Sequence, residues 1–266
     1  MLGQGLGTIA PWSTKYPNNG VGGSNNNGRK WFKHLTEVNS DEDSEGAGQS
    51  NSSGNGDQGT LAGGDRINSW GGHDGTDINW GQETSADKPT YDGTEKTACA
   101  FNGNQFFDAS SDMAIGGSSD FAIVVRFKCT NFDSARAIMG DTSNEHIMLT
   151  NNQTISVKIN GTNRNFQETG ETVLATDQYY TLIIVRKNDS MTTHIKGGAF
   201  TNDTLWGAEI ASAAGDITIS NLGAAADDTN NFVGFITDTI IYTTNDGGLS
   251  RESNRVALHN AIENKY

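Results

Sequence analysis

The sequence contains few of the residues that mark membrane proteins and disulfide-rich scaffolds. Only 3 of the 266 residues are proline and only 2 are cysteine. No apolar run approaches the ~20 residues that a membrane-spanning helix requires. The first residues lack the cationic start and the apolar stretch of a secretory signal. We therefore expect no membrane insertion and no disulfide framework.

Positive charge is also scarce. Lys and Arg total 18 against 32 Asp and Glu, which gives a formal net charge of -14. Because phosphate binding requires a basic surface, the composition argues against a nucleic-acid partner. The five histidines are scattered without the spacing of a zinc motif. We therefore expect no zinc site.

Glycine and polar residues dominate two segments of the first third of the chain. Residues 1–30 are predicted to form an extended arm, because they cannot bury enough apolar surface to offset the entropy of ordering. The arm carries isolated apolar residues that we expect to dock onto a neighbouring protein: Leu2, Leu6, Ile9 and Trp12. Residues 39–64 are predicted to be a long polar surface loop, with a disordered linker as the alternative.

The rest of the chain, residues 31–266, has the pattern of a single all-β domain. No proline follows Pro89, so backbone donors remain free for sheet ladders. Short apolar segments separated by turn residues predict strands near 31–36, 64–70, 99–103, 105–108, 121–128, 136–140, 146–149, 155–159, 179–185, 192–196, 217–222 and 232–242. So many strands without helices between them indicate a two-sheet sandwich or jelly roll.

One short helix is expected at the C-terminus, where it would cover a sheet or close one end of the sandwich. Ser250 is positioned to cap this helix and Glu252 lies in its first turn. Leu258, Ala261 and Ile262 recur at helical spacing.

Candidate binding residues are few. Two segments rich in carboxylates are candidates for calcium, with ordinary turn formation as the alternative; they contain Asp74, Asp77, Asp227 and Asp228. Trp80, and Trp206 in a predicted loop at 201–207, are the candidates for stacking on a glycan or packing against a partner protein. The acidic run 41–45 lies in a polar loop and is interpreted as solvated charge.

Cys99 and Cys129 both fall on apolar strand segments. A free thiol in such a place behaves as a small buried hydrophobe. A disulfide would require the two Cα atoms to lie within about 7 Å, which the sequence does not establish. We expect free thiols.

Several short segments, taken in order, carry a family resemblance. They are Gly64-Asp-Arg-Ile-Asn-Ser-Trp70, Asp87-Lys-Pro-Thr-Tyr91, Ala100-Phe-Asn-Gly103, Phe121-Ala-Ile-Val-Val-Arg-Phe127, Ser220-Asn-Leu-Gly223, Phe232-Val-Gly-Phe-Ile236 and Leu249-Ser-Arg-Glu252. Together they resemble the concanavalin A-like, or laminin-G-like, jelly roll. More narrowly, they resemble the structural proteins of tailed bacteriophages, especially cyanophages and other phages of marine bacteria, which often open with a segment like Met1-Leu-Gly-Gln-Gly-Leu-Gly7.

The resemblance implies a virion component that is exposed on the particle, assembled in the bacterial cytoplasm, and attached to other virion proteins through its N-terminal arm. A capsid decoration protein or a tail-associated module, as a symmetric homo-oligomer, is the first reading. A tail-fibre adhesin that binds host surface glycans is the alternative, although fibre-shaft repeats are missing. A glycan hydrolase is a distant third, because the Glu-x-Asp-x-x-Glu strand of retaining glucanases with this fold does not occur here, and we assign no catalytic residues. Relatives of this fold often bind calcium, and no other cofactor is expected.

Overall fold

The computed structural model describes residues 29–32, 50–51, 64, 66–71, 79–92, 94, 98–166, 173–226 and 230–263. The anchor residues Leu2, Leu6, Ile9 and Trp12 lie outside the described residues, as do most of the predicted loop 39–64 and the calcium candidates Asp74, Asp77, Asp227 and Asp228. Within the predicted loop, the two-residue strand β2 (Ser50–Asn51) pairs with β3 (Ile67–Gly71). The remainder forms the predicted two-sheet sandwich.

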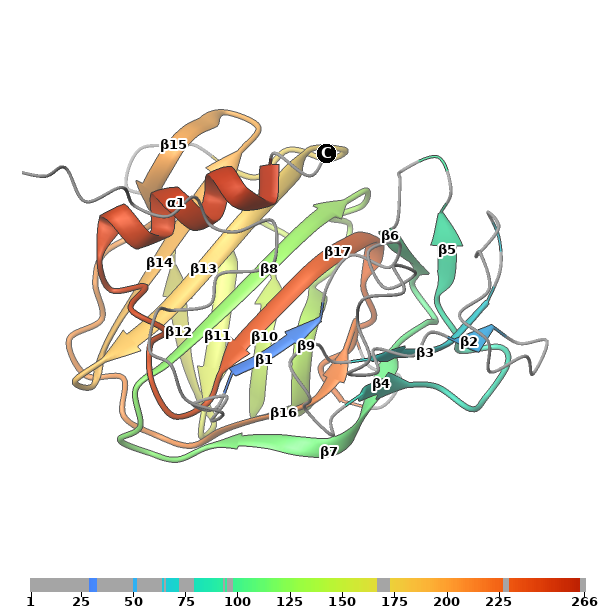
Figure 1. The fold of residues 1–266 in the computed structure, drawn as a ribbon, viewed down its shortest axis with the longest axis horizontal. Helices are drawn as coiled ribbons and strands as arrows, with labels where there is room; N and C mark the ends of the chain where they lie inside the picture. Colours follow the sequence, from blue (N-terminus) through green and yellow to red (C-terminus); the bar gives the residue numbers. More distant parts are fainter. Residues whose placement is uncertain are drawn as a thin grey trace, which may run out of the picture.

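The front sheet in Figure 1 has the strand order β15-β14-β13-β8-β17-β6-β5, and β1 also pairs with β17. All of its pairings are antiparallel. Its strands are β1 (Arg29–Phe32), β5 (Thr90–Asp92), β6 (Ala98–Asn102), β8 (Phe121–Cys129), β13 (Tyr179–Lys187), β14 (Ser190–Gly197), β15 (Phe200–Leu205) and β17 (Val233–Tyr242).

The back sheet has the strand order β12-β11-β10-β9-β16-β7-β4-β3-β2, and it is also antiparallel. Besides β2 and β3, its strands are β4 (Asn79–Gly81), β7 (Phe107–Ile115), β9 (Arg136–Thr142), β10 (Glu145–Leu149), β11 (Ile155–Ile159), β12 (Thr162–Phe166) and β16 (Ile217–Leu222). The main core lies between the two sheets.

The first half of β8 is apolar at every position because both of its faces are covered. Phe121, Ile123 and Val125 belong to the core between the sheets, whereas Ala122 and Val124 belong to a second apolar cluster on the outer face. Beyond Val125 the pattern alternates, and the outward residues are the half-buried Arg126 and Lys128. The change from a continuous to an alternating pattern therefore marks where the covering layer ends.

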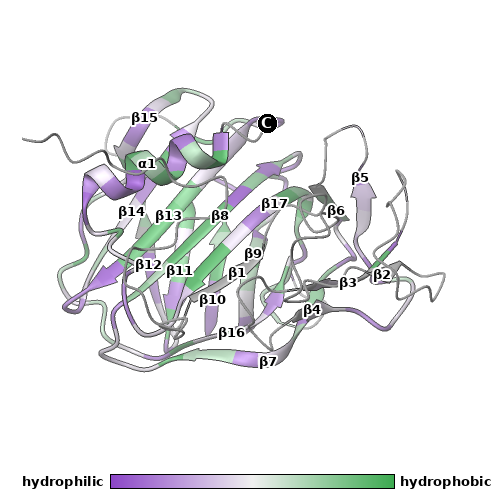
Figure 2. Ribbon diagram, viewed as in Figure 1, coloured by the Kyte–Doolittle hydropathy of each residue, from purple (hydrophilic) through white to green (hydrophobic). Residues whose placement is uncertain are grey.

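That covering layer includes helix α1 (Glu252–Glu263), which lies across the front sheet as predicted (Figure 1). Figure 2 shows the helix, part hydrophilic and part hydrophobic, over the front sheet at β13 and β14. Leu258 and Ile262 pack with outer-face residues of β8, β13 and β17. Burying each such side chain contributes roughly 1.5–3 kcal/mol before entropy costs. The helix therefore completes the outer layer of the front sheet.

The helix begins differently from the predicted cap. The amides of Asn254 and Arg255 bond to the carbonyl of Arg251. The Ser250 hydroxyl instead bonds to Asp246, whose carboxylate also accepts from the Gly248 amide. Asp246 thus organises the turn that leads into α1, and it accepts a hydrogen bond from the Ser250 hydroxyl, which was expected to cap the helix.

Several strands were not predicted, among them β2 and β4 in the back sheet and the edge strands β12 and β15. β15 occupies most of the segment 201–207 that was interpreted as a loop, and β12 was also missed. Both are rich in Thr and Asn and have little apolar alternation. Each is held by hairpin pairing to its neighbour, β14 or β11, rather than by a buried face of its own. Polar edge strands of this kind give no hydrophobic signal in a sequence.

The two cysteines are free and buried, as predicted. Cys99 lies opposite Ile236 and Cys129 lies opposite Gly234, on either side of β17. Two strand spacings of about 4.8 Å separate their strands, which exceeds the reach of a disulfide. Burial raises the pKa of the Cys99 thiol well above its usual value and that of Cys129 to about 11, the latter despite a backbone hydrogen bond at Asn131 and the charge of Arg136, which both lower it.

We expect a thiol-reactive reagent to titrate two sulfurs per chain in denaturant without reductant, and close to none in the native state. The physical reason is the burial of both thiols and their raised pKa values. Cys99→Ala and Cys129→Ala should each lower the free energy of unfolding by about 1 kcal/mol, the cost of a small core truncation. Finding no reactive sulfur in the denatured chain would contradict this expectation.

Candidate functional site

The most irregular part of the back sheet is a wide bulge in β7. Asp108 lies opposite Asn221 and Met113 opposite Ile219, so β7 advances five residues while β16 advances two. The intervening residues 109–112 are therefore unpaired with β16, and Ala109 pairs with Trp80 of β4 on the other side. Bulges of this kind often re-aim side chains beside functional sites.

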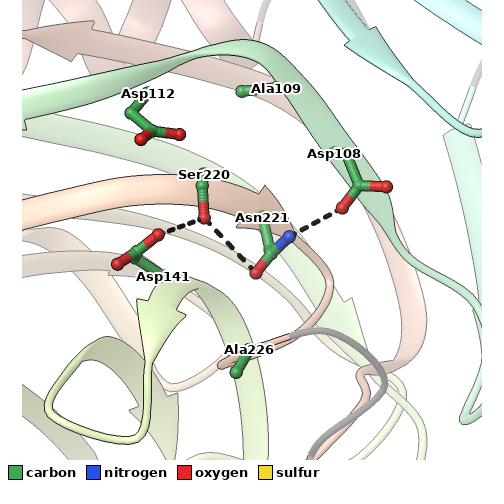
Figure 3. Close-up of a pocket in the computed structure, with 7 residues that line it drawn as sticks. All are labelled: Asp108, Ala109, Asp112, Asp141, Ser220, Asn221 and Ala226. Carbon is green, nitrogen blue, oxygen red and sulfur yellow. Dashed lines mark hydrogen bonds between the residues drawn. The ribbon is translucent and has the colours of Figure 1, made fainter.

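A polar hollow of about 450 Å³ lies at this bulge (Figure 3). Asp108, Ala109 and Asp112 of β7, Asp141 of β9, and Ser220 and Asn221 of β16 line it, together with Ala226. A second hollow of about 550 Å³ shares Asp108 and Ala109 and adds Ser110, Ser69 and residues 80–84. Because they share residues, we treat the two hollows as one surface depression and call it the β7 groove.

Hydrogen bonds order the floor of the β7 groove, and Figure 3 shows them as dashed lines. The Ser220 hydroxyl donates to Asp141 Oδ1 at 2.6 Å and also lies 3.5 Å from Asn221 Oδ1. The Asn221 amide donates to Asp108 Oδ1 at 2.8 Å. Asn221 is itself only 2 % exposed, so it holds Asp108 from below. The floor thus presents the carboxylates of Asp141 and Asp108, two hydrogen-bond acceptors that are held in fixed orientations.

The chemistry of the β7 groove is that of a hydrogen-bond acceptor. Of the described residues that line it, four are acidic, several carry hydroxyl or amide groups, and none is Lys, Arg or His. Such a surface can accept hydrogen bonds from ligand hydroxyl or ammonium groups. No local sequence pattern indicates this site, because its residues come from strands far apart in the chain.

The structure contradicts the interpretation of Trp80 and Trp206 as ligand or protein contacts. Both are 0 % exposed and belong to the core between the sheets. Trp80 sits opposite Trp70 in the β3–β4 ladder, and the Trp206 ring packs against Phe200 with 5.6 Å between ring centroids and an angle of 39° between the rings. Large aromatic area is worth most inside a core, where both faces of the ring are covered. Neither indole can therefore form a platform for a sugar.

No group of three or more His, Cys, Asp or Glu side chains with the arrangement of a metal site occurs in the part of the chain that the structure describes. Three Asp residues line the β7 groove without forming such a group. In the same described residues, no helix is long and apolar enough to cross a membrane.

A second polar cluster lies under α1, between β14 and β15. Asp203 is 2 % exposed at its side chain, and it accepts from Arg255 Nε at 2.9 Å and lies 3.0 Å from His259 Nε2. His194 Nδ1 is 3.8 Å away. Arg255 and His259 share the buried stripe of α1 with Leu258 and Ile262. We call Asp203, Arg255, His259 and His194 the α1 anchor, because they tie the helix to the edge of the front sheet.

Burial controls ionisation in the α1 anchor. Burial, together with the charge of nearby Arg255, lowers the pKa of His194 to about 4 against the opposing effect of Asp203. Burial alone would raise the pKa of Asp203, but the hydrogen bond with His259 and the charge of Arg255 outweigh it, so that pKa is lowered. Hollows of about 330 Å³ and 480 Å³ flank this cluster. The sequence does place Arg255 and His259 on the same helical face as Leu258, but polar residues were not expected in a buried stripe.

No protein-family model matches the sequence, and no curated protein is significantly similar to it. Solved structures do share its fold. Two structures of a GH54 α-L-arabinofuranosidase, one soaked with a cyclic sulfate inhibitor and one a mutant soaked with 4-nitrophenyl α-L-arabinofuranoside, align with TM-scores of 0.55 and 0.57 at 11 % identity. Each alignment covers 75 % of this chain and 51 % of the enzyme, so the chain spans about half the length of those proteins.

The carbohydrate-binding module CBM66 from Bacillus subtilis aligns with a TM-score of 0.32 and 13 % identity over 62 % of this chain and 89 % of the module. The described residues form an antiparallel two-sheet jelly roll of the concanavalin A-like type with one short C-terminal helix.

Proposed function

We propose that this chain is a non-enzymatic module displayed on the particle of a tailed bacteriophage, as a capsid decoration or tail-associated protein. The observation that carries the proposal is the ordered series of segments that resembles laminin-G-like phage structural proteins. The fold is consistent with that reading, since the segments 121–127 and 232–236 lie in or beside the central strands β8 and β17. Residues 1–30 would attach the module to other virion proteins, and a symmetric homo-oligomer would present it.

Deleting residues 1–30 tests the attachment. We expect the truncated protein to fold and to be lost from assembled particles. The apolar cores described above are built from residues 67–262, and the deletion removes only Arg29 and Lys30 of β1 from the described sheets. The measurement is the amount of protein in purified particles from a complementation assay, with circular dichroism as the check on folding. Normal incorporation of the truncated protein would overturn the role of the arm.

Binding of host surface glycans is the second candidate function, and the β7 groove is the observation that favours it. The groove holds ordered hydrogen-bond acceptors, Asp141 and Asp108, at fixed positions on a rigid sheet. Fixed polar groups on a rigid scaffold are what recognition of sugar hydroxyls requires. Glycan-array binding by the purified protein tests this function.

We expect no hydrolysis of any glycan that is bound, because the Glu-x-Asp-x-x-Glu strand does not occur in this sequence. Product analysis by chromatography after prolonged incubation checks this. Release of sugar that survives purification and disappears in Asp112→Asn or Asp141→Asn would reverse the assignment as a non-enzyme.

A further inference from the structure

The described lining of the β7 groove is acidic. Its acidic lining residues are Glu83, Asp108, Asp112 and Asp141, and no described lining residue is cationic. In a chain of net charge -14, no excess of positive charge elsewhere offsets this local field. A ligand that enters the groove must therefore supply hydrogen-bond donors and must not add further negative charge.

Among the acidic residues of the β7 groove, Asp112 is the one best placed to contact an incoming ligand. It lies on the bulge of β7, it is exposed, and it makes no hydrogen bond or ion pair within the described chain. Figure 3 shows it across the hollow from Asp141, with Ser220 between them. Asp141, in contrast, already accepts the Ser220 hydroxyl. A sugar hydroxyl or ammonium group could replace water at Asp112, whereas a carboxylate there would be repelled.

We infer that the β7 groove takes a hydroxyl-rich glycan without acidic groups, either neutral or amino-substituted, and excludes glycans that carry uronate or sialate carboxylates. This inference rests on the second function proposed above and adds the class of ligand to it. The exclusion is electrostatic, so it weakens as salt is added.

The probe is a set of neutral hexose oligosaccharides together with the same oligosaccharides oxidised at their primary hydroxyls to carboxylates. We expect the full-length protein to bind at least one neutral member in titration calorimetry, and its oxidised counterpart about tenfold more weakly or worse at low salt, the ratio that one added like-charge contact supplies. Asp112→Lys should remove or reverse that preference. Glu252→Lys makes the same change in net charge on α1, over the opposite sheet, and should leave the preference intact.

The possible outcomes distinguish failure of the charge selection from failure of glycan binding itself. Equal or tighter binding of the oxidised forms overturns the charge selection while glycan binding stands. A preference that survives Asp112→Lys overturns the role of the groove, provided that the variant unfolds at the temperature of the parent protein. Binding of no oligosaccharide in either form overturns both the inference and the second function.

Discussion

Replacing Arg186 with Met should destabilise this protein by on the order of 3 kcal/mol, a large effect for a single substitution. Arg186 is 0 % exposed, and its guanidinium donates to four backbone carbonyls. Nε bonds to Ser119, Nη2 to Gly116, and Nη1 to Ala213 and Gly215, at 2.6–3.1 Å. One side chain thus joins β13 to two separate loops, and Met would leave the carbonyls of both without these donors. The measurement is urea denaturation at pH 7.

Two further variants identify the cause of the loss. Arg186→Lys keeps the positive charge but replaces a planar fork of five donors with one point of attachment, so most of the destabilisation should remain. Arg251→Met removes an exposed arginine and should change stability by no more than about 0.5 kcal/mol. Wild-type stability in Arg186→Lys would show that charge, rather than geometry, holds the loops.

Acid should destabilise the protein through His194. The folded-state pKa of His194 is about 4 against an ordinary value of 6.5. Between these pH values the unfolded chain binds a proton that the folded chain does not, so stability falls as the pH drops from 6.5 to 4 and levels off below 4. At 1.36 kcal/mol per pKa unit the loss is on the order of 3 kcal/mol. Charge repulsion in this acidic chain also changes with pH. The informative quantity is therefore the difference between wild type and His194→Asn in how the free energy of unfolding depends on pH.

Protonation of Asp203 also lowers the free energy of unfolding, at lower pH than protonation of His194 does. Because its pKa is lowered in the folded state, its contribution is complete above the ordinary value of 3.8 and is lost as the pH falls through the folded-state pKa. Denaturation curves recorded from pH 3 to pH 7 should therefore show a shallower decline between pH 6.5 and pH 4 in His194→Asn than in wild type. His146→Asn is the comparison outside the α1 anchor: burial also lowers the pKa of His146, so this variant should show a smaller reduction of the same slope than His194→Asn. An unchanged slope in His194→Asn would refute the role of the α1 anchor.

The sequence by itself determined the sandwich, most of its strands and the helix. The apolar segment at 121–128 and the pattern of Leu258 and Ile262 are local signals, because strand and helix periodicities place apolar residues on defined faces whatever lies opposite. The free thiols followed in the same way, since apolar strand segments bury a Cys wherever the strand is placed.

Only the tertiary structure decided which polar residues meet. Asp112, Asp141 and Ser220 are separated by up to 108 positions, from 112 to 220, and they converge because β7, β9 and β16 lie together in the back sheet. The polar neighbours of Trp206 in the sequence favour an exposed position for it. In the structure those neighbours form an edge strand, and the Trp206 indole at its end lies in the core. Strand order depends on pairings between distant segments, and these are fixed by packing that a local pattern does not encode.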